Sequence, residues 1–390
     1  MDTHFDDLET RSQDAREAAQ LTALNAQLDL HGLTPLADLT ELVQLPVLRK
    51  ADLVSRQQEA PPFGDIPVQN VVHVFQSPGP IYEPGGISFD WWRLGRFLHA
   101  AGIGCDDLVQ NCFGYHMTPA GMIFENGARA VGARIFPAGT GQTELQVRAA
   151  ADLGVTAYAG TPDYLKVILE KADEMGVALN LRKAVVSGGA LFPSLRQSYA
   201  DAGISCLQCY ATADLGNIAY ESPAMEGMIL DEGVIVEIVT PGTGDPVPDG
   251  EVGEVVVTSL NPDYPLIRFA TGDMSAILPG QSPCGRTNAR IKGWMGRADQ
   301  TTKIKGMFVR PEQVAELVKR HPEVQRARVL AQRSGDADHM VVQFEAEDAD
   351  ADGLGATVRD VLKLRGDVEI VAPGALPRDG VVIEDQRTYE

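Results

Sequence analysis

A regular alternation of short apolar runs and amphipathic segments dominates the sequence between Val68 and Tyr210. Strand-like runs such as VVHVF, VTAYAG and KAVVSGGA are separated by helix-like segments such as DYLKVILEKADEMG. Short apolar runs bounded by turn residues are typical of buried strands, and the segments between them are long enough to connect parallel strands. The alternation therefore predicts a parallel α/β sheet with right-handed crossovers.

The segments on either side of this region follow other patterns. Before it, the spacing of Ala, Leu and Gln residues predicts helices over about Leu8–Leu30 and Leu36–Leu53. After it, short apolar runs between Gly227 and Leu278, joined by PGTGDPVPDGEVG, predict an antiparallel or barrel-like β module. Beyond Gly306 the pattern predicts the order helix, strand, strand, helix, strand, which fits a small α+β domain.

Composition and charge limit the classes of protein to which this chain can belong. The chain has 390 residues, 44% of them hydrophobic, and a formal net charge of −21, so we expect a folded protein without a nucleic-acid partner. The sequence shows no apolar run of membrane-spanning length, and its polar N-terminus does not resemble a signal peptide. We therefore expect a cytoplasmic protein without a membrane partner. The five scattered cysteines predict reduced thiols.

The most specific motifs lie between Ile267 and Gly306, which contains IRFATGDM, CGRTNARI and GRADQTTKIKG. Upstream, SGGALF and YATADLG each follow a predicted strand. Together these strings resemble the adenine, ribose and hinge segments of the adenylate-forming superfamily, and in particular the phenylacetate-CoA ligase group. The resemblance extends over nearly the whole chain, from QLPVLRKADL to ALPRDG.

This resemblance implies a fold and an activity. Such enzymes activate a carboxylate with ATP to an acyl-adenylate, then rotate a small domain and transfer the acyl group to coenzyme A. We expect a large multi-layer α/β domain with a β-barrel-like module over residues 1–298. A small, mobile α+β domain should cover residues 299–390.

The resemblance also implies a nucleotide site. Asp273 in RFATGD matches the aspartate that accepts hydrogen bonds from both ribose hydroxyls. Consecutive glycines in SGGALF suit close approach to the adenine ring, on which the Tyr210 ring would stack. An aspartate after a glycine also caps ordinary turns, and a glycine pair also makes them, so structural roles stay open. The nucleotide set implied is Gly188, Gly189, Ala190, Tyr210, Ala211, Thr212, Asp273 and Arg297.

Three residues form the implied catalytic set. Asp214, the acid of YATADLG, takes the place of the residue that holds Mg²⁺, although an aspartate reaches less far than the usual glutamate. Arg297 in GRADQ would face the nucleotide, and Asp299 in the same string would be the hinge. His116 could orient a carboxylate, but a lone histidine after a strand is as often structural.

The resemblance places an acyl pocket between the FGYH and GTPDYL segments. Its aromatic residues and small number of charges suit an aryl or arylacetic carboxylate, although an aromatic cluster is also consistent with ordinary core packing. The pocket residues implied are Tyr115, His116, Gly160, Thr161, Pro162 and Tyr164.

The phosphate loop departs from the family pattern. Where the family has SSGTTGKP, this chain has SPGPIYEP, which keeps Ser77 and Gly79. Prolines at positions 78 and 80 remove backbone N–H donors, and Glu83 places a negative charge where a triphosphate would lie. We expect this degenerate loop to bind ATP poorly.

Two further departures concern the C-terminus and a metal. Val381 or Val382 stands where the family has its adenylation lysine, and Arg387 is out of register with it. Some relatives hold a structural zinc, but the corresponding positions here do not form a zinc ligand set, and we expect no zinc. These positions are Tyr220, Ser222, Ile229, Ser282 and Cys284.

Three functions therefore stay open. The first is a CoA ligase that uses ATP, Mg²⁺ and coenzyme A on an aryl carboxylate. The second is an enzyme that has lost adenylation and transfers the acyl group of a preformed adenylate or acyl-CoA. The third is a non-catalytic binding protein. For each we expect a small-molecule carboxylate or acyl-CoA as partner and a homodimeric state.

Overall fold

The protein consists of two compact units, Met1–Met295 and Gly296–Glu390. This division comes from a computed structural model of the chain. The residues that it describes are 3–189, 191–240, 243–295, 298, 302–305, 307–309, 311–334, 337–377 and 381–387.

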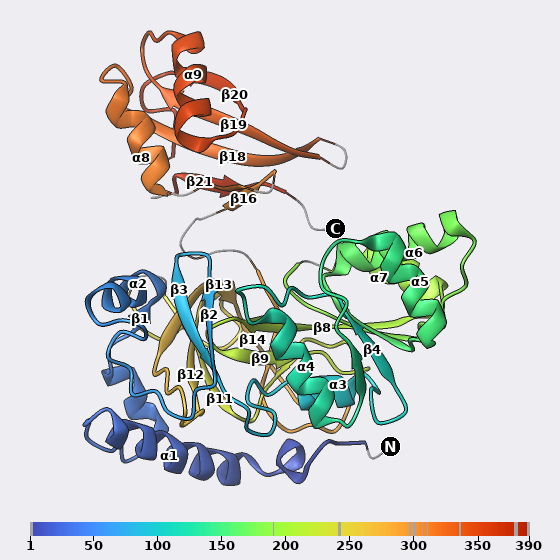
Figure 1. The fold of residues 1–390 in the computed structure, drawn as a ribbon. Coiled ribbons are helices and arrows are strands. Elements are labelled where there is room, and N and C mark those ends of the chain that lie inside the picture. The colour runs from blue at the N-terminus through green and yellow to red at the C-terminus, as the bar shows by residue number, and fades with distance from the viewer. Residues whose placement is uncertain are drawn as a thin grey trace. The chain divides into compact units, whose positions relative to one another are not determined.

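A sheet of nine strands, counted over the described residues, forms the centre of the larger unit (Figure 1). Its order is β14-β15-β10-β9-β8-β7-β6-β4-β5. The parallel half consists of β4 (Leu108–Asn111), β5 (Arg134–Phe136), β6 (Ala157–Gly160), β7 (Lys183–Val186) and β8 (Ser205–Thr212). Its helices are α3 (Gly95–Ala100), α4 (Ala120–Ala130), α5 (Thr143–Leu153), α6 (Pro162–Met175) and α7 (Pro193–Asp201). The predicted parallel α/β sheet is confirmed.

Helix α6 shows how the sequence sets these elements. Pro162 lies in its first turn, where the missing N–H interrupts no helical bond, and Gly176 caps its C-terminus. Leu165 and Ile168 recur at helical spacing and are fully buried. The start of α6 is thereby held directly after strand β6.

The antiparallel half of the large sheet continues into the β module. It contains β9 (Gly216–Tyr220), β10 (Met228–Leu230), β14 (Ile277–Leu278) and β15 (Arg290–Ile291). A second sheet has the order β1 (Leu48–Arg49), β13 (Phe269–Ser275), β12 (Gly253–Ser259) and β11 (Val234–Val239). A separate antiparallel hairpin is formed by β2 (His73–Ser77) and β3 (Ile81–Gly85).

The N-terminal segment agrees only partly with the sequence pattern. Helix α1 (Gln13–Leu30) follows the short 3-10 helix η1 (Asp7–Thr10), and the Ser12 hydroxyl caps α1 by accepting a hydrogen bond from the Ala15 amide at 3.3 Å. The single helix predicted over Leu36–Leu53 is wrong. The structure has instead η2 (Leu39–Gln44), strand β1 and α2 (Lys50–Glu59). Pro46 interrupts the helical pattern, and β1 pairs in parallel with β13.

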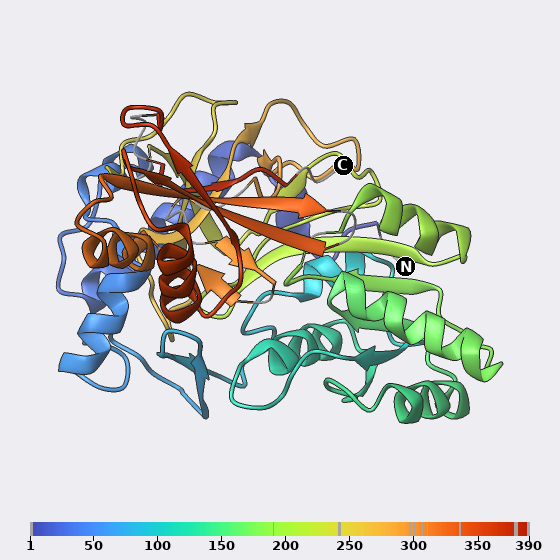
Figure 2. The same ribbon diagram turned by 90° about the horizontal axis from the view of Figure 1, so that it is seen from above.

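The smaller unit contains the predicted order helix, strand, strand, helix, strand, with short strands before and after it that the sequence pattern did not predict. It contains β16 (Thr302–Ile304), β17 (Met307–Val309), α8 (Pro311–Arg320), β18 (Arg326–Ser334), β19 (Ala337–Glu345), α9 (Ala351–Leu362), β20 (Asp367–Val371) and β21 (Ile383–Asp385). Its main sheet has the order β20-β19-β18-β21. Figures 1 and 2 both show α8 and α9 side by side, and a hydrogen bond of 2.8 Å joins the ring of His321 to the hydroxyl of Thr357. The small α+β fold is confirmed.

Candidate active site

Asp273 lies on β13 and is 9% exposed. Its Oδ2 accepts a hydrogen bond from the Tyr210 hydroxyl at 2.8 Å, and its Oδ1 accepts one from Trp294 Nε1 at 3.0 Å. Tyr210 belongs to β8 of the large sheet, beside a register shift between Tyr210 and Ala211, with Thr212 ending the strand. The structure thus brings together two residues of the predicted nucleotide set from two different sheets.

The predicted glycine pair lies against the predicted acyl segment. Gly188 has a positive φ of 71°, and a Cβ there would lie 3.8 Å from Thr161 Cγ2. A Cβ on Gly189 would lie 3.4 Å from Pro162 Cδ. Ser187 anchors the turn, because its hydroxyl donates to the carbonyl of Cys209 at 3.0 Å. Ala190 lies outside the described residues.

Gly160 ends β6 in a position that admits no side chain. A Cβ there would lie 2.1 Å from the Tyr158 hydroxyl, which donates to the carbonyl of Thr161 at 3.0 Å. Tyr164 is engaged elsewhere, because its hydroxyl donates to the carbonyl of Gly141 at 3.1 Å, in the segment before α5. Thr161 and Pro162 therefore face the glycine pair, whereas the Tyr164 hydroxyl contacts the segment that leads into α5.

The FGYH segment follows β4. The Tyr115 hydroxyl accepts a hydrogen bond from Asn111 Nδ2 at 2.8 Å, and burial raises the pKa of Tyr115 above its usual range. A Cβ on Gly121 would lie 2.8 Å from the Tyr115 ring, so this ring packs directly on the first turn of α4. His116 is exposed at the surface of the unit.

Two buried carboxyl groups and a half-exposed lysine occupy the predicted phosphate region. Lys50 Nζ donates to Asp214 Oδ2 at 2.9 Å, and the Ser77 hydroxyl donates to Glu83 Oε1. Glu83 is 1% exposed, and burial, together with the negative charge of Asp214, raises the pKa of Glu83 to about 7. The remaining oxygens, Asp214 Oδ1 and Glu83 Oε2, accept no hydrogen bond in the part of the chain that the structure describes. Glu83 is therefore protonated below neutral pH and only partly protonated at pH 7.

The phosphate-loop segment itself is a tight hairpin. Ser77 is opposite Ile81 in the β2–β3 ladder, and a Cβ on Gly79 would lie 2.8 Å from the Ile81 side chain. The amide of Gln57, on α2, accepts from the Tyr82 N–H and donates to the Tyr82 carbonyl, both at 2.8 Å. The turn between the strands is thus packed on its own residues, and its second strand is bound to α2.

Sequence reasoning did not identify Lys50 or Gln57. Lys50 begins α2 and contacts Asp214, 164 residues later in the chain. Helical spacing indicates which residues share a helix face, but it does not report a partner so far along the sequence. The sequence did hold one indication of Lys50: it is the lysine of QLPVLRKADL, the string at which the resemblance to the family begins.

Comparisons with known proteins agree with this geometry. The family model for AMP-binding enzymes matches residues 105–261. The phenylacetate-coenzyme A ligase of Escherichia coli (strain K12) is 28% identical over 96% of this chain and 95% of its own length. That of Thermus thermophilus is 28% identical over 82% of this chain and 76% of its own length. The chain is similar to phenylacetate-CoA ligases over nearly its whole length, and its residues 105–261 match AMP-binding enzymes.

Solved structures show the same fold. A 2-hydroxyisobutyryl-CoA ligase in complex with 2-HIB-AMP and CoA superposes with a TM-score of 0.74 at 24% identity, covering 98% of this chain and 92% of that one. The amide bond synthetase McbA from Marinactinospora thermotolerans gives a TM-score of 0.52 at 18% identity, covering 79% and 66% of the two chains. The adenylate-forming fold is therefore present over nearly the whole chain.

At the C-terminal positions that depart from the adenylate-forming pattern, backbone contacts tie the segment to β18. The Val381 carbonyl accepts from Arg328 Nε at 3.0 Å, and the Val382 carbonyl accepts from the Val329 amide at 2.9 Å. Arg387 donates to Asp338 at 3.0 Å within the smaller unit. Arg297 and the hinge residue Asp299 lie outside the described residues, and their roles stay predictions.

A polar network occupies the positions where some adenylate-forming relatives hold zinc. The Tyr220 hydroxyl donates to the buried carboxylate of Glu9 at 2.6 Å, and Arg286 forms an ion pair with the same carboxylate. The Ser282 hydroxyl and Cys284 Sγ lie 3.1 Å apart. Within the described ranges, no cluster of three or more His, Cys, Asp and Glu residues could hold a metal ion. Over those same ranges, no helix has the length and apolar character to cross a membrane.

Proposed function

We propose that this acyl-CoA ligase-like protein binds an aryl carboxylate, or its activated form, together with an adenine nucleotide and coenzyme A. The hydrogen bond between Tyr210 and Asp273 carries the proposal, because it joins the predicted adenine and ribose segments from two separate sheets. The names of the relatives, phenylacetate-coenzyme A ligase, support an aryl acid as substrate. The 2-HIB-AMP and CoA in the similar solved structure support an acyl-adenylate and a thiol acceptor.

The residues fit the adenylate half of a nucleotide. Both oxygens of Asp273 already accept from an O–H and an N–H donor, so ribose hydroxyls can replace these donors without leaving the carboxylate unsatisfied. The backbone of Gly188 and Gly189 lies against Thr161 and Pro162, which places the adenine segment next to the acyl segment. An acyl-adenylate would supply an activated carbonyl for thioester formation. Asp273 would hold its ribose, and the Tyr115 ring would form part of the acyl wall.

The residues do not fit a triphosphate. Glu83 and Asp214 place two buried carboxyl groups in the phosphate region, and the Lys50 ammonium already neutralises Asp214. A triphosphate placed there would face Glu83 instead of the family lysine. Mg²⁺ would have to reach Asp214 through its buried Oδ1, because Lys50 occupies Oδ2.

A second candidate function follows from this cluster. The protein would have lost ATP-dependent adenylation and would transfer the acyl group of a preformed adenylate or acyl-CoA. The ion pair between Lys50 and Asp214, beside a partly protonated Glu83, favours this function because it stabilises the region without phosphate. A non-catalytic binding protein would use the same contacts without turnover.

Calorimetry separates these functions. The intact protein is titrated with AMP, with ATP and Mg²⁺, and with coenzyme A, and carboxylate-dependent AMP release is measured in parallel. We expect AMP and coenzyme A to bind, and ATP with Mg²⁺ to bind more weakly than AMP. Firm ATP binding with AMP release would contradict the second candidate, whereas no binding of AMP or coenzyme A would contradict the proposed nucleotide site.

A reversal experiment tests the cause of the loss. The double variant Glu83→Lys with Val381→Lys restores both family cations, and Glu83→Gln with Val381→Gln is its neutral control. Carboxylate-dependent AMP release in the lysine variant alone would show that the missing charges prevent adenylation. Equal activity in both variants would contradict this explanation.

We also propose a cytoplasmic homodimer whose residues 299–390 move during the reaction cycle. Exposed apolar side chains on and after the β2–β3 hairpin support self-association, since Phe89 is 75% exposed and Ile87 and Val74 are also exposed. Sedimentation equilibrium of the wild type and of Phe89→Asp tests the dimer. A wild-type monomer at micromolar concentration would contradict it.

A further inference from the structure

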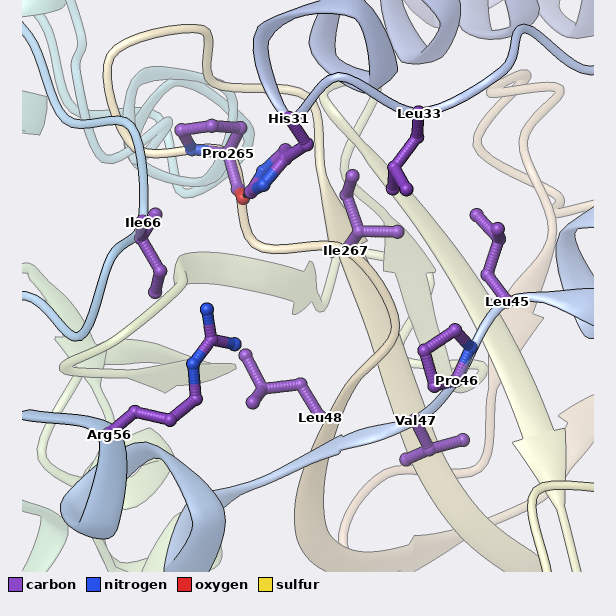
Figure 3. Close-up of a pocket in the computed structure, with 10 residues that line it drawn as sticks. All are labelled: His31, Leu33, Leu45, Pro46, Val47, Leu48, Arg56, Ile66, Pro265 and Ile267. Atoms are coloured by element: carbon purple, nitrogen blue, oxygen red, sulfur yellow. The ribbon is translucent and has the colours of Figure 1, made fainter.

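A cavity of about 240 Å³ lies in the larger unit (Figure 3). It is formed where the end of α1, the segment around β1, helix α2 and the chain leading into β13 meet. Its lining is mainly apolar and includes Leu33, Leu45, Leu48, Ile66 and Ile267. Leu33 is exposed, so the cavity reaches the surface of the unit.

Arg56 gives this apolar cavity a positive charge. Its side chain reaches from α2 towards Leu48 and Ile66 (Figure 3). The guanidinium is half-buried, and across the described ranges it has no ion pair or hydrogen bond. Other shielded arginines of this unit are paired: Arg16 lies 3.0 Å from Glu232, and Arg268 lies 2.9 Å from Glu237.

The other titratable group of the lining is already satisfied. His31 Nε2 lies 3.0 Å from the carbonyl of Pro265, which can only accept, so this nitrogen donates. The cavity therefore combines an apolar wall with one cationic donor that has no partner in the described part of the chain. A negative charge on an apolar body complements both features.

We propose that this cavity binds a small apolar monocarboxylate, with its carboxylate on the Arg56 guanidinium and its hydrocarbon part against Leu48 and Ile66. A guanidinium presents parallel N–H donors that match the two oxygens of a carboxylate. The volume lies below the roughly 300–1,000 Å³ of sites for drug-sized ligands, which favours a small acid. None of the lining residues belongs to the predicted nucleotide or acyl set.

The position of the cavity connects it to the proposed active site. Leu48 pairs with Phe269 in the β1–β13 ladder, and β13 carries Asp273. Arg56 lies on the same helix as Lys50, which holds Asp214. A bound acid would therefore contact β1, which pairs with the strand of Asp273, and α2, which carries the lysine bound to Asp214.

Calorimetry on the full chain tests this site with octanoate as probe. We expect octanoate to bind, and neutral octanamide to bind about tenfold more weakly or worse, because it lacks the charge-assisted hydrogen bonds. Arg56→Leu should weaken octanoate binding about tenfold or more and leave octanamide unchanged. Arg148→Leu is the matched control, since Arg148 is an exposed α5 residue paired with Glu144, and it should change nothing.

A second variant locates the binding site. Leu33→Trp fills the cavity from an exposed position and should weaken octanoate and octanamide alike, with an unchanged melting temperature. The proposal is overturned if wild-type protein does not bind octanoate at millimolar concentration. It is also overturned if Arg56→Leu or Leu33→Trp binds octanoate as the wild type does, or if inorganic phosphate binds as tightly as octanoate.

Discussion

Replacement of the buried acid in the phosphate region should change stability in a pH-dependent way. The pKa of Glu83 is raised from 4.5 to about 7, first because the side chain is buried and then because Asp214 lies nearby. The folded protein therefore binds a proton on Glu83 at pH values where the unfolded chain has released it. The stability that protonation of Glu83 contributes is fully present below about pH 4.5. It is lost as the pH rises through 7.

The size of the effect follows from this rise in pKa. A change from 4.5 to about 7 corresponds to roughly 3 kcal/mol of unfolding free energy once both states are deprotonated. Glu83→Gln removes the charge and keeps an oxygen that can accept from the Ser77 hydroxyl. We expect the variant to be more stable than wild type, with an advantage that grows by about 2 kcal/mol between pH 5 and pH 8.

Urea unfolding at pH 5, 6, 7 and 8 measures this advantage. The chain has three tryptophans, Trp91, Trp92 and Trp294, all in the larger unit, so their fluorescence reports the unit that contains Glu83. Exposed Glu251, replaced by Gln, is the control and should show no pH-dependent difference from wild type. A Glu83→Gln advantage that is constant over this range, or a loss of stability at pH 8, would refute the reasoning.

Three further outcomes test the fold and the site. Gly160→Ala should destabilise the protein by about 1–3 kcal/mol in urea unfolding, because its Cβ would lie 2.1 Å from the buried Tyr158 hydroxyl. Gly114→Ala should be near neutral, because the nearest atom to its Cβ, in Thr118, would be 4.0 Å away. Arg16→Ala should cost about 2 kcal/mol by the same method, since it removes a buried contact with Glu232, which keeps its ion pair with Arg11. Asp273→Ala should weaken AMP binding about tenfold or more in calorimetry, and unchanged affinity would contradict a ribose contact.

The sequence predicted the fold wherever one residue pattern determined one element. Buried apolar strands such as β6 and β7 were predicted because their apolar residues are contiguous and helices follow them. The segment around Pro46 was misassigned because the helical spacing of its leucines continues across a residue that stops a helix. The pairing of β1 with β13 depends on residues more than two hundred positions apart, which no local pattern reports.

The candidate site was predictable to the extent that its residues lie in recognisable strings. RFATGD and YATADLG pointed to Asp273 and Tyr210, which the structure places in contact. SPGPIYEP indicated that Glu83 is unfavourable for a triphosphate, but its burial and its proximity to Asp214 follow only from the folded arrangement. The sequence did not indicate a role for Lys50, because its partner Asp214 lies in the turn between β8 and β9, far along the chain.

The hydrogen bonds that hold the β2–β3 hairpin also protect the protein from self-assembly through strand edges. An isolated two-stranded ribbon exposes unpaired backbone groups on both sides, and such groups can template the addition of another chain. Here the side chain of Gln57 takes the N–H and C=O of Tyr82 on one edge, and the carbonyl of Met117 accepts from the Gln76 N–H on the other, at 2.9 Å. Each edge is thus closed at one residue within its strand, so an incoming strand finds no continuous row of free groups.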